Sequence, residues 1–429
     1  MKIDSRFLGK IRRQFPGSDR DPTGRKRVFL DNGAGTLVTR QSLDRECQAR
    51  VDWSANVGNI FTESRGAEQT ITEGRAAVAD LLNAEGPENI ISGESATSLF
   101  FNLSYALGRE LTGSENVVTT GYEHYTNVDP WIELGNRRKI KELRFADFDK
   151  ATGELDIENL KALVDKNTKV VTVSAASNVL GTRTDLVEVR KMAKEVGAYF
   201  AVDAVHHVAH GPTDVKAIGC DFLIFSGYKL FSRHGSFMYM RPRAMTRLQP
   251  FKVRSAPRHG PEKWEWGTRD QAMFAAIGGA VDYLAWMSNP SAKLPPKPGR
   301  SRRSRIAKTM FMIEDYEAGL TNLALEGRGD TLGLNHIPGL TLYGPDRIPS
   351  KLGRDPTFSF TLKGLKDHDV SKTLWSKYNL AVGAEDYFSR VPAQYRKKTM
   401  LRATFVHYNT KGEVLALLKA LNDLSSRKR

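Results

Sequence analysis

The sequence predicts an α/β protein in which a large domain with a mainly parallel sheet precedes a smaller α+β domain. From about residue 75, segments with apolar residues at helical spacing alternate with short runs of β-branched and aromatic residues. Strands that alternate with helices form a parallel sheet whose two faces are covered by the helices. A Pro- and Arg-rich stretch at 290–305 ends this alternation, so a second folding unit is expected after it.

The elements expected in the large domain follow from these patterns. The helical segment at 185–197 ends in Gly197, a residue that favours a helix C-terminus. We expect helices at 73–83, 98–111, 128–137, 156–167 and 185–197. We expect strands at 116–120, 139–145, 169–175, 198–204, 221–227 and 236–241.

The elements expected in the smaller domain begin with a long helix. Its apolar pattern covers 306–327, and another helical pattern at 411–424 lies near the end of the sequence. Between them we expect strands at 357–364, 380–385 and 400–409 and a helix at 367–379. The chain is therefore divided into a basic N-terminal arm at 1–28, a large domain at 29–287, a basic linker at 288–305 and a small domain at 306–429.

The formal net charge of +15 is concentrated in two segments. Residues 1–30 carry +6 and residues 288–310 carry +7, so the rest of the chain is nearly neutral. Such a distribution is compatible with a patch for a polyanion or with solvated charge that aids solubility. We favour solvated charge and expect no nucleic-acid partner, because no interleaved aromatic residues or nucleic-acid motif accompany the basic residues.

The sequence favours a cytoplasmic protein. It has no apolar run long enough to span a membrane, and its first residues lack the apolar core of a signal peptide. It has two cysteines, Cys47 and Cys220, with no CxxC motif and no Cys/His pair at metal-ligand spacing.

Polar residues follow four of the expected strands. In a doubly wound sheet the carboxyl ends of the strands face one crevice, so these side chains are expected to converge. They are His124, Asn178, Asp203, His206, Ser226 and Lys229.

This set of side chains suits pyridoxal phosphate. A lysine can form a Schiff base with its aldehyde, and a carboxylate can keep its pyridine nitrogen protonated. An aromatic ring can stack on the pyridine, and an amide can bind the ring oxygen. The phosphate needs hydroxyls and the N–H groups of a helix N-terminus, which "SGESATSLFFNL" supplies at Ser95, Ala96 and Thr97.

These motifs, from "FLDNGAGT" at residue 29 to "LRATFVHYNTKGEV" ending at residue 414, resemble the class V aminotransferase family. The resemblance is to the cysteine desulfurase-like branch of these fold-type I pyridoxal-phosphate enzymes, and it implies a seven-stranded sheet. It implies that Lys229 is the Schiff-base lysine, that Asp203 pairs with the pyridinium and that His124 stacks on the ring. By the same resemblance, Asn178 and His206 reach the ring oxygen, and Ser226, Ala96 and Thr97 bind the phosphate.

The resemblance also implies residues that lie further along the chain. "EWGTRD" resembles the segment that brings Gly267 and Thr268 from a second subunit onto the phosphate, which implies a homodimer with a shared active site. Arg402 resembles the arginine that grips the substrate α-carboxylate, for which a bidentate guanidinium is suited.

One motif departs from that branch. Cysteine desulfurases carry a nucleophilic cysteine on a loop before this arginine, and here its place falls near Phe388 in "LAVGAEDYFSRVP". Glu385, Asp386 and Tyr387 of the same loop could act as acid–base groups or shape the substrate pocket. Persulfide-forming desulfuration is therefore not expected.

The expected reaction is lyase-type chemistry on a small α-amino acid: C–S or C–C cleavage, decarboxylation, or decarboxylative or aldol-type C–C bond formation. An aminotransferase, an epimerase and a non-catalytic member that binds a polyanion remain the alternatives. His206, His207 and His210 in "HHVAH" have a spacing that could hold a metal, but no nearby Glu completes a metal motif, so none is expected.

Overall fold

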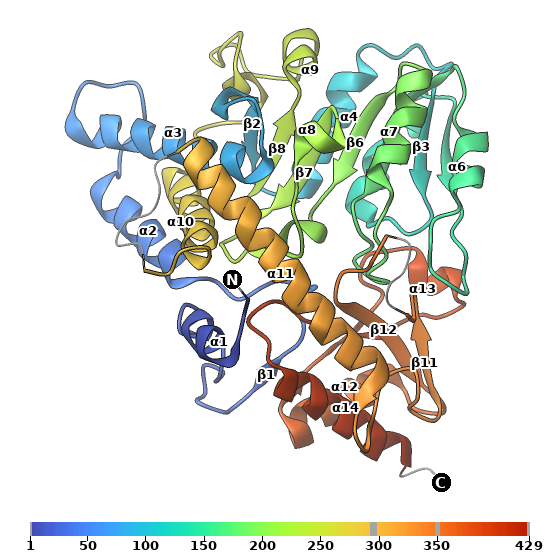
Figure 1. The fold of residues 1–429 in the computed structure, drawn as a ribbon. Coiled ribbons are helices and arrows are strands. Elements are labelled where there is room, and N and C mark those ends of the chain that lie inside the picture. The colour runs from blue at the N-terminus through green and yellow to red at the C-terminus, as the bar shows by residue number, and fades with distance from the viewer. Residues whose placement is uncertain (1, 292–297, 348–351, 427–429) are drawn as a thin grey trace.

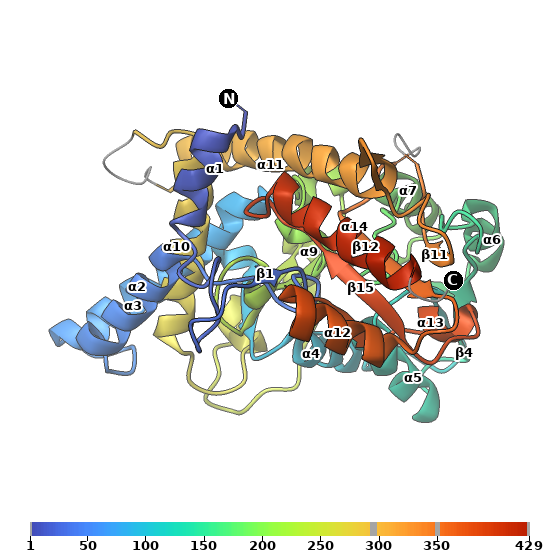
Figure 2. The same cartoon turned by 90° about the horizontal axis from the view of Figure 1, so that it is seen from below.

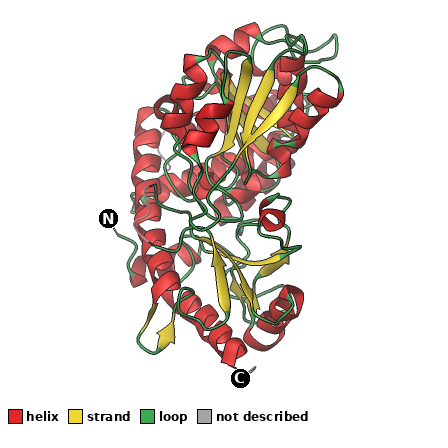
Figure 3. Ribbon diagram, turned by 90° about the vertical axis from the view of Figure 1, so that its right-hand side faces the viewer, coloured by secondary structure: helices red, strands yellow, loops and turns green. Residues whose placement is uncertain are grey.

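The computed structural model describes residues 2–291, 298–347 and 352–426, and its two larger sheets lie at opposite ends of the molecule (Figure 1, Figure 3). The larger sheet has seven strands in the order β2-β8-β7-β6-β5-β3-β4, and β8 runs in the opposite direction to the other six. The predicted mainly parallel, seven-stranded sheet is therefore confirmed. Its strands are β2 (Ile90–Gly93), β3 (Asn116–Thr120), β4 (Glu142–Ala146), β5 (Thr168–Ser174), β6 (Tyr199–Asp203), β7 (Phe222–Ser226) and β8 (Ser236–Met240).

Helices cover both faces of this sheet because alternate strand residues point to opposite sides. Phe222 and Ile224 of β7 pack in one core, with α4 and α5, whereas Leu223 and Phe225 pack in the other, with α3, α7 and α10. The helices are α3 (Thr62–Leu82), α4 (Ala96–Gly108), α5 (Asp129–Asn136), α6 (Ile157–Leu163), α7 (Leu186–Glu195), α8 (Val215–Ile218), α9 (Pro242–Arg247) and α10 (Gln271–Met287).

The smaller sheet is antiparallel, with the order β11-β12-β15-β14. Residues of α12 and α14 pack with β12 and β15 in a separate core, and Figure 2 shows both helices beside this sheet. The elements are β11 (Leu340–Tyr343), β12 (Thr357–Leu362), α12 (Asp367–Tyr378), β14 (Gly383–Glu385), α13 (Val391–Gln394), β15 (Met400–Thr404) and α14 (Lys411–Ser426). A short hairpin joins β9 (Gly327–Arg328) to β10 (Thr331–Leu332).

The N-terminal segment packs against both domains. Helix α1 (Ser5–Arg12) and the residues after it bury Phe7, Ile11 and Phe15 in the core that contains α10. Strand β1 (Val28–Phe29) then pairs in parallel with β13 (Leu380–Ala381) of the smaller domain. This segment therefore contributes to the fold as well as carrying positive charge.

Helix α11 (Arg300–Glu326) contacts α3 and α10 of the large domain and α14 of the small one, so it spans both (Figure 1). Part of the predicted linker, at 292–297, lies outside the described residues. The linker arginines from Arg300 onward form the first turns of this helix. Arg302 pairs with Asp80 at 2.7 Å and Arg303 with Asp214 at 3.1 Å.

Within the described ranges, no helix combines the length and apolar character needed to cross a membrane.

The close crossing of α10 and α2 (Arg40–Asp52) gives a test of packing. A Cβ at Gly279 would lie 2.3 Å from the backbone oxygen of Gln41, whereas a Cβ at the exposed helical Gly319 would have no atom within 4 Å. We expect Gly279→Ala to lower the free energy of unfolding by about 1–3 kcal/mol through overpacking. Gly319→Ala should raise it by about 0.4–1 kcal/mol. Denaturant unfolding of the two variants measures this, and equal midpoints would contradict the packing described.

Candidate active site

A cavity of about 380 Å³ lies at the carboxyl ends of β3, β5, β6 and β7, between the larger sheet and the small domain. Its volume is that of a site for a cofactor or small molecule. The cavity brings together most residues expected from the sequence. These are Ala96, Thr97, His124, Asn178, Asp203, His206, Ser226, Lys229, Glu385, Tyr387 and Arg402. Their individual roles stay predictions.

Lys229 is buried one short turn after β7. Its Nζ donates to the backbone carbonyl of Gly33. Burial, followed by the charge of Arg402, lowers the pKa of Lys229 to about 7. Near neutral pH this lysine therefore carries a substantial fraction of neutral amine, the form that reacts with carbonyl groups.

Gly33 brings the N-terminal segment close to this lysine. A Cβ here would lie 2.6 Å from Thr404 Oγ1 and 2.9 Å from Arg402 Cζ. A residue without a side chain is therefore required in the "DNGAG" motif, where the backbone approaches both the lysine and the arginine.

Asp203 is the last residue of β6 and is 4% exposed. Its Oδ1 accepts from the Val205 backbone N–H at 2.9 Å, and burial raises its pKa to about 7. Within the described part of the chain it has no ion-pair partner. A buried carboxylate in this position is suited to a cationic group that enters from the cavity.

His124 lies at the mouth of the cavity, where the chain leaves β3. Its Nδ1 accepts from the Thr126 backbone N–H at 3.0 Å, and burial lowers its pKa to about 4. The ring is therefore neutral at physiological pH and held at a fixed angle. A neutral aromatic face is compatible with stacking on a heterocycle.

The N-terminus of α4 opens into the same cavity. Ser95 is the N-cap and forms a reciprocal capping box with Ser98, which leaves the N–H groups of Ala96 and Thr97 in the first turn. Thr97 Oγ1 lies 2.8 Å from Thr126 Oγ1, which adds two hydroxyls. Ser226 lines the cavity from the end of β7. This arrangement can bind a phosphate group.

Arg402 enters the cavity from β15 of the small domain. It donates through Nη1 to the Asn178 backbone oxygen at 3.0 Å, and its Nη2 lies 3.4 Å from Asp31 Oδ1. Its Nε has no partner among the described residues, although Arg402 is only 2% exposed. A guanidinium with an unused donor in a cavity is suited to a carboxylate ligand.

Tyr387 supports this arginine. The Arg402 Cζ lies 3.9 Å from the centre of the Tyr387 ring. The Tyr387 hydroxyl donates to the Met400 backbone oxygen at 2.8 Å, and burial raises its pKa. Tyr387 thus holds Arg402 in place, and its hydroxyl is already committed to the backbone.

The loop that carries Tyr387 is fixed across the mouth of the cavity. Tyr387 and Phe388 have φ values of 57° and 51°, which side-chain-bearing residues rarely adopt. The Tyr125 backbone N–H donates to the Phe388 oxygen at 2.8 Å, and Ser389 Oγ donates to the Glu123 oxygen at 3.0 Å. These bonds place the Phe388 ring 6.0 Å from that of His124.

Several cavity residues were not anticipated from the sequence. Gly33, Ala34, Ser174, Ala176 and Tyr228 line it. The glycine and alanine lie in the motif "FLDNGAGT". This motif indicated the family, but it did not indicate that these residues would line the cavity of the lysine. The others lie at or just after the ends of expected strands, so their positions were the available signal.

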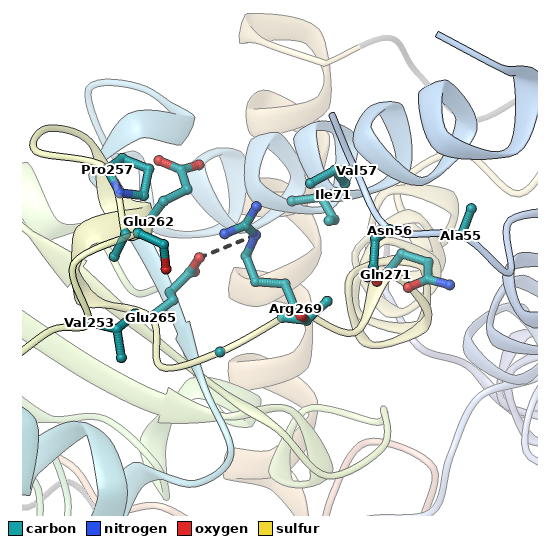
Figure 4. A pocket seen from close by; sticks show the side chains of 14 residues that line it. Ala55, Asn56, Val57, Ile71, Val253, Pro257, Glu262, Glu265, Arg269 and Gln271 are labelled. Carbon is teal, nitrogen blue, oxygen red and sulfur yellow. Dashed lines mark ion pairs between the residues drawn. The ribbon is translucent and has the colours of Figure 1, made fainter. Parts of the chain in front are cut away.

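Gly267 and Thr268 do not line the Lys229 cavity of the same chain. Both are exposed, and they line a neighbouring cavity of about 360 Å³ that is bordered by residues 55–57 and 253–257 (Figure 4). Beside them Arg269 pairs with Glu265 at 3.5 Å. Their contact with a phosphate in a second subunit remains a prediction.

The buried Asp203 gives a pH-dependent test. Its pKa is raised from 3.8 to about 7 in the folded protein, so the folded state binds more protons than the unfolded state between these values. The free energy of unfolding therefore falls as pH rises through this window. Without added cofactor, Asp203→Asn should be more stable than the parent at pH 8, on the order of 4 kcal/mol, and equal to it below about pH 4. Thermal unfolding measures this, with the exposed Asp330→Asn as control; no gain at pH 8 would contradict the assignment.

Comparisons with known proteins identify the family of the chain. The family model for class-V aminotransferases matches residues 28–293. A curated cysteine desulfurase from Yersinia pestis (strain Pestoides F) is 28% identical over 430 residues, covering 96% of this chain and 97% of that protein.

Solved structures show the same fold. A cysteine desulfurase from Thermococcus onnurineus NA1 has a TM-score of 0.82 at 23% identity, covering 96% of this chain and 98% of its own. The cysteine desulfurase CsdA from Escherichia coli has a TM-score of 0.79 at 22% identity, covering 98% of both chains. The predicted fold-type I architecture is therefore confirmed. The chain belongs to the class-V aminotransferase family, and its cofactor is pyridoxal phosphate.

Proposed function

We propose that this protein catalyses lyase-type chemistry on a small α-amino acid, with pyridoxal phosphate attached to Lys229. The reaction class comprises C–S or C–C cleavage, decarboxylation, and decarboxylative or aldol-type C–C bond formation. The observation that carries the proposal is the composition of one cavity. It joins a buried amine, a buried carboxylate and a carboxylate-binding arginine, and no cysteine is among the described residues that line it.

The residues of the cavity fit the cofactor. Asp203 is buried without an ion-pair partner in the described chain, so it can hold the pyridine nitrogen protonated. The N-terminus of α4, with Thr97, and the hydroxyl of Ser226 can hold the phosphate. His124 can cover one face of the ring. Pyridoxal phosphate supplies an aldehyde that captures amines and a ring that accepts electrons from the bond that breaks.

The chain's own residues would then bind the substrate and move protons. Arg402, supported by the Tyr387 ring, binds the α-carboxylate and fixes the orientation of the amino acid. Lys229 Nζ, whose pKa is lowered to about 7, can take a proton from Cα or return one to the product. Phe388 and His124 lie together at the mouth of the cavity and restrict the access of water.

The available cysteines argue against the sulfur transfer of the named relatives. Cys47 lies on the exposed side of α2, and Cys220 is fully buried before β7, where burial raises the pKa of its thiol. Neither lines the Lys229 cavity. Transfer of sulfur to a thiol of the enzyme would therefore have no nucleophile at the reacting centre.

A polyanion-binding role has less support. In the described part of the linker, Arg302 and Arg303 already pair with acidic residues of the large domain. Paired arginines contribute less positive potential to a surface than free ones.

We further infer a homodimer in which Gly267 and Thr268 reach the partner's cavity. These residues are exposed in a single chain, and exposed apolar side chains lie on the segments around them. They include Val51, Ile60, Phe61, Val253 and Trp266. A second copy that covers this face would remove apolar area from water and complete the phosphate site.

The reaction is tested by incubating the holoenzyme with individual α-amino acids and identifying products by mass spectrometry and NMR. We expect lyase or decarboxylation products from at least one amino acid, and loss of both turnover and the cofactor's visible absorbance in Lys229→Ala. The double variant Cys47→Ser/Cys220→Ala should retain activity, because no thiol takes part. Formation of alanine and enzyme persulfide from cysteine, abolished in that double variant, would overturn the proposal. Keto acids or inverted amino acids as the sole products would instead identify an aminotransferase or an epimerase.

The shared active site is tested by mixing two inactive variants. Lys229→Ala lacks the amine, and Thr268→Asp places a negative charge against the phosphate. In a mixed dimer one site receives Lys229 from one chain and Thr268 from the other, so about a quarter of all sites should be intact after exchange. Recovery of that fraction of activity, with a dimer mass by light scattering, is the expected result. A monomeric mass, or full cofactor binding by Thr268→Asp alone, would contradict the shared site.

A further inference from the structure

A set of buried polar groups behind His206 has no part in the roles assigned above. His206 is 5% exposed and lines the cavity. Its Nε2 lies 2.9 Å from Thr357 Oγ1, which in turn lies 3.0 Å from Thr404 Oγ1. Thr357 and Thr404 are opposite residues on the paired strands β12 and β15. Hydroxyls of the small domain thus reach a ring that belongs to the large domain.

The other side of the His206 ring faces a buried ion pair. The ring of His210 lies 5.1 Å from that of His206, centre to centre. His210 Nδ1 is 2.8 Å from Glu317 Oε2 on α11, and each side chain is 3% exposed. Glu317 lies on α11, far along the sequence from the "HHVAH" motif, so nothing in that motif indicates it as a partner.

The electrostatics keep His206 neutral. Burial raises the pKa of Glu317, and although burial alone would lower the pKa of His210, Glu317 raises it, so the two hold a proton between them. Burial, followed by the charge on His210, lowers the pKa of His206 well below its usual value. The proton therefore lies on the pair and not on His206.

Other charged groups surround this set. Asp355 accepts from Arg183 Nε at 2.9 Å and lies 3.0 Å from His207 Nδ1, and Arg183 also pairs with Glu314 at 2.5 Å. Asp355 favours a charged His206, but the positive groups outweigh it. The positive groups that lower the pKa of His206 are His210, Lys229 and Arg402. Burial, followed by the charge on His210, also lowers the pKa of His407.

Three residues of this cluster also lie close enough together to hold a metal ion. Ligand atoms of His206, His210 and Asp355 lie within 4.8 Å of one another. However, His206 Nε2 contacts Thr357, His210 Nδ1 contacts Glu317, and the Asp355 carboxylate is already paired with Arg183 and His207. The three residues therefore have protein partners, which favours a hydrogen-bond network over coordination.

We propose that Thr404, Thr357 and the His210–Glu317 pair are positioning residues that hold His206 as a neutral ring with its proton on Nδ1. A neutral imidazole has one donor and one acceptor. If Thr404 donates to Thr357 and Thr357 donates to Nε2, the proton must lie on Nδ1, which has no protein partner in the described chain. Nδ1–H can then donate to the ring oxygen of the cofactor, so the inference rests on the cofactor-binding part of the proposed function. If the hydrogen bonds ran in the opposite direction, the proton would lie on Nε2. Nδ1 would then direct its lone pair at the negatively charged ring oxygen of the cofactor.

The test is a pH titration of the visible absorbance of the resting holoenzyme. A hydrogen-bond donor to the ring oxygen of the cofactor stabilises the negative charge on that oxygen, so the proton next to the oxygen is lost at a lower pH. Loss of the donor should therefore raise the midpoint pH of the absorbance titration. We expect Thr357→Val to raise the midpoint by about 1 pH unit and weaken cofactor binding about tenfold. Thr357→Ser, which keeps the hydroxyl, should restore the parental midpoint. Thr404→Val provides a second variant if Thr357→Val does not fold, with a smaller shift in the same direction.

The ion pair is tested with matched variants on the same helix. Glu317→Gln removes the proton-holding partner of His210, so the charge on His210 is lost and the pKa of His206 rises. We expect a second absorbance transition below about pH 6.5, where His206 gains a proton. Glu326→Gln breaks the exposed pair with His336, which is 3.0 Å long, and should leave the titration unchanged.

Two results would overturn this assignment. One is an unchanged midpoint in both folded threonine variants. The other is one divalent metal per chain in the purified holoenzyme, lost in His210→Asn, which would make the cluster a metal site. The absorbance titration does not depend on turnover, so failure to detect a lyase product would not change the outcome of this test. A holoenzyme preparation without any visible band would overturn the cofactor assignment and this inference together.

Discussion

The burial of Lys229 and Asp203 at the ends of adjacent strands is the constraint on which the rest of the site depends. Each loses hydration, and burial brings both pKa values to about 7 from opposite directions. Such a pair of groups is costly in a protein without a ligand, since neither is compensated by an ion pair in the described chain. Under the proposed function, the cofactor supplies what both lack: an aldehyde for the amine and a cationic nitrogen for the carboxylate. The burial that destabilises the protein without cofactor is therefore relieved when the cofactor binds, and this relief contributes to the affinity.

The second domain completes the site from the opposite side. Arg402 comes from β15 and lies over the ring of Tyr387, while Thr357 and Thr404 reach His206. Helix α11 spans the two domains and carries Glu317, the partner of His210. The cofactor face and the substrate face are therefore held by contacts that require both domains in one relative position. Under the roles proposed above, movement between domains would alter substrate binding and the environment of the ring oxygen at the same time.

The sequence predicted the features that depend on local pattern. Lys229 and Asp203 were identifiable because polar residues at the ends of apolar strands are unusual, and the order of strands and helices indicated the sheet. The short strand β2 (Ile90–Gly93) was missed by pattern because its few residues end in Ser92 and Gly93, which do not favour strands. Glu317 could not be found, because α11 is far from the "HHVAH" motif in the sequence and only folding brings them together.

The loop at the mouth of the cavity is the part of the site on which the proposed reaction depends most. The loop is tied to the His124 segment by two hydrogen bonds to backbone oxygens. Tyr387 and Phe388 occupy a left-handed conformation that costs energy, so these bonds and the packing of Tyr387 beneath Arg402 must compensate for it. These contacts fix the position of the loop beside Arg402 and His124. Tyr387 and Phe388 therefore give the cavity a fixed aromatic wall, and under the proposed function this wall helps Arg402 to hold the amino acid in one orientation at Lys229.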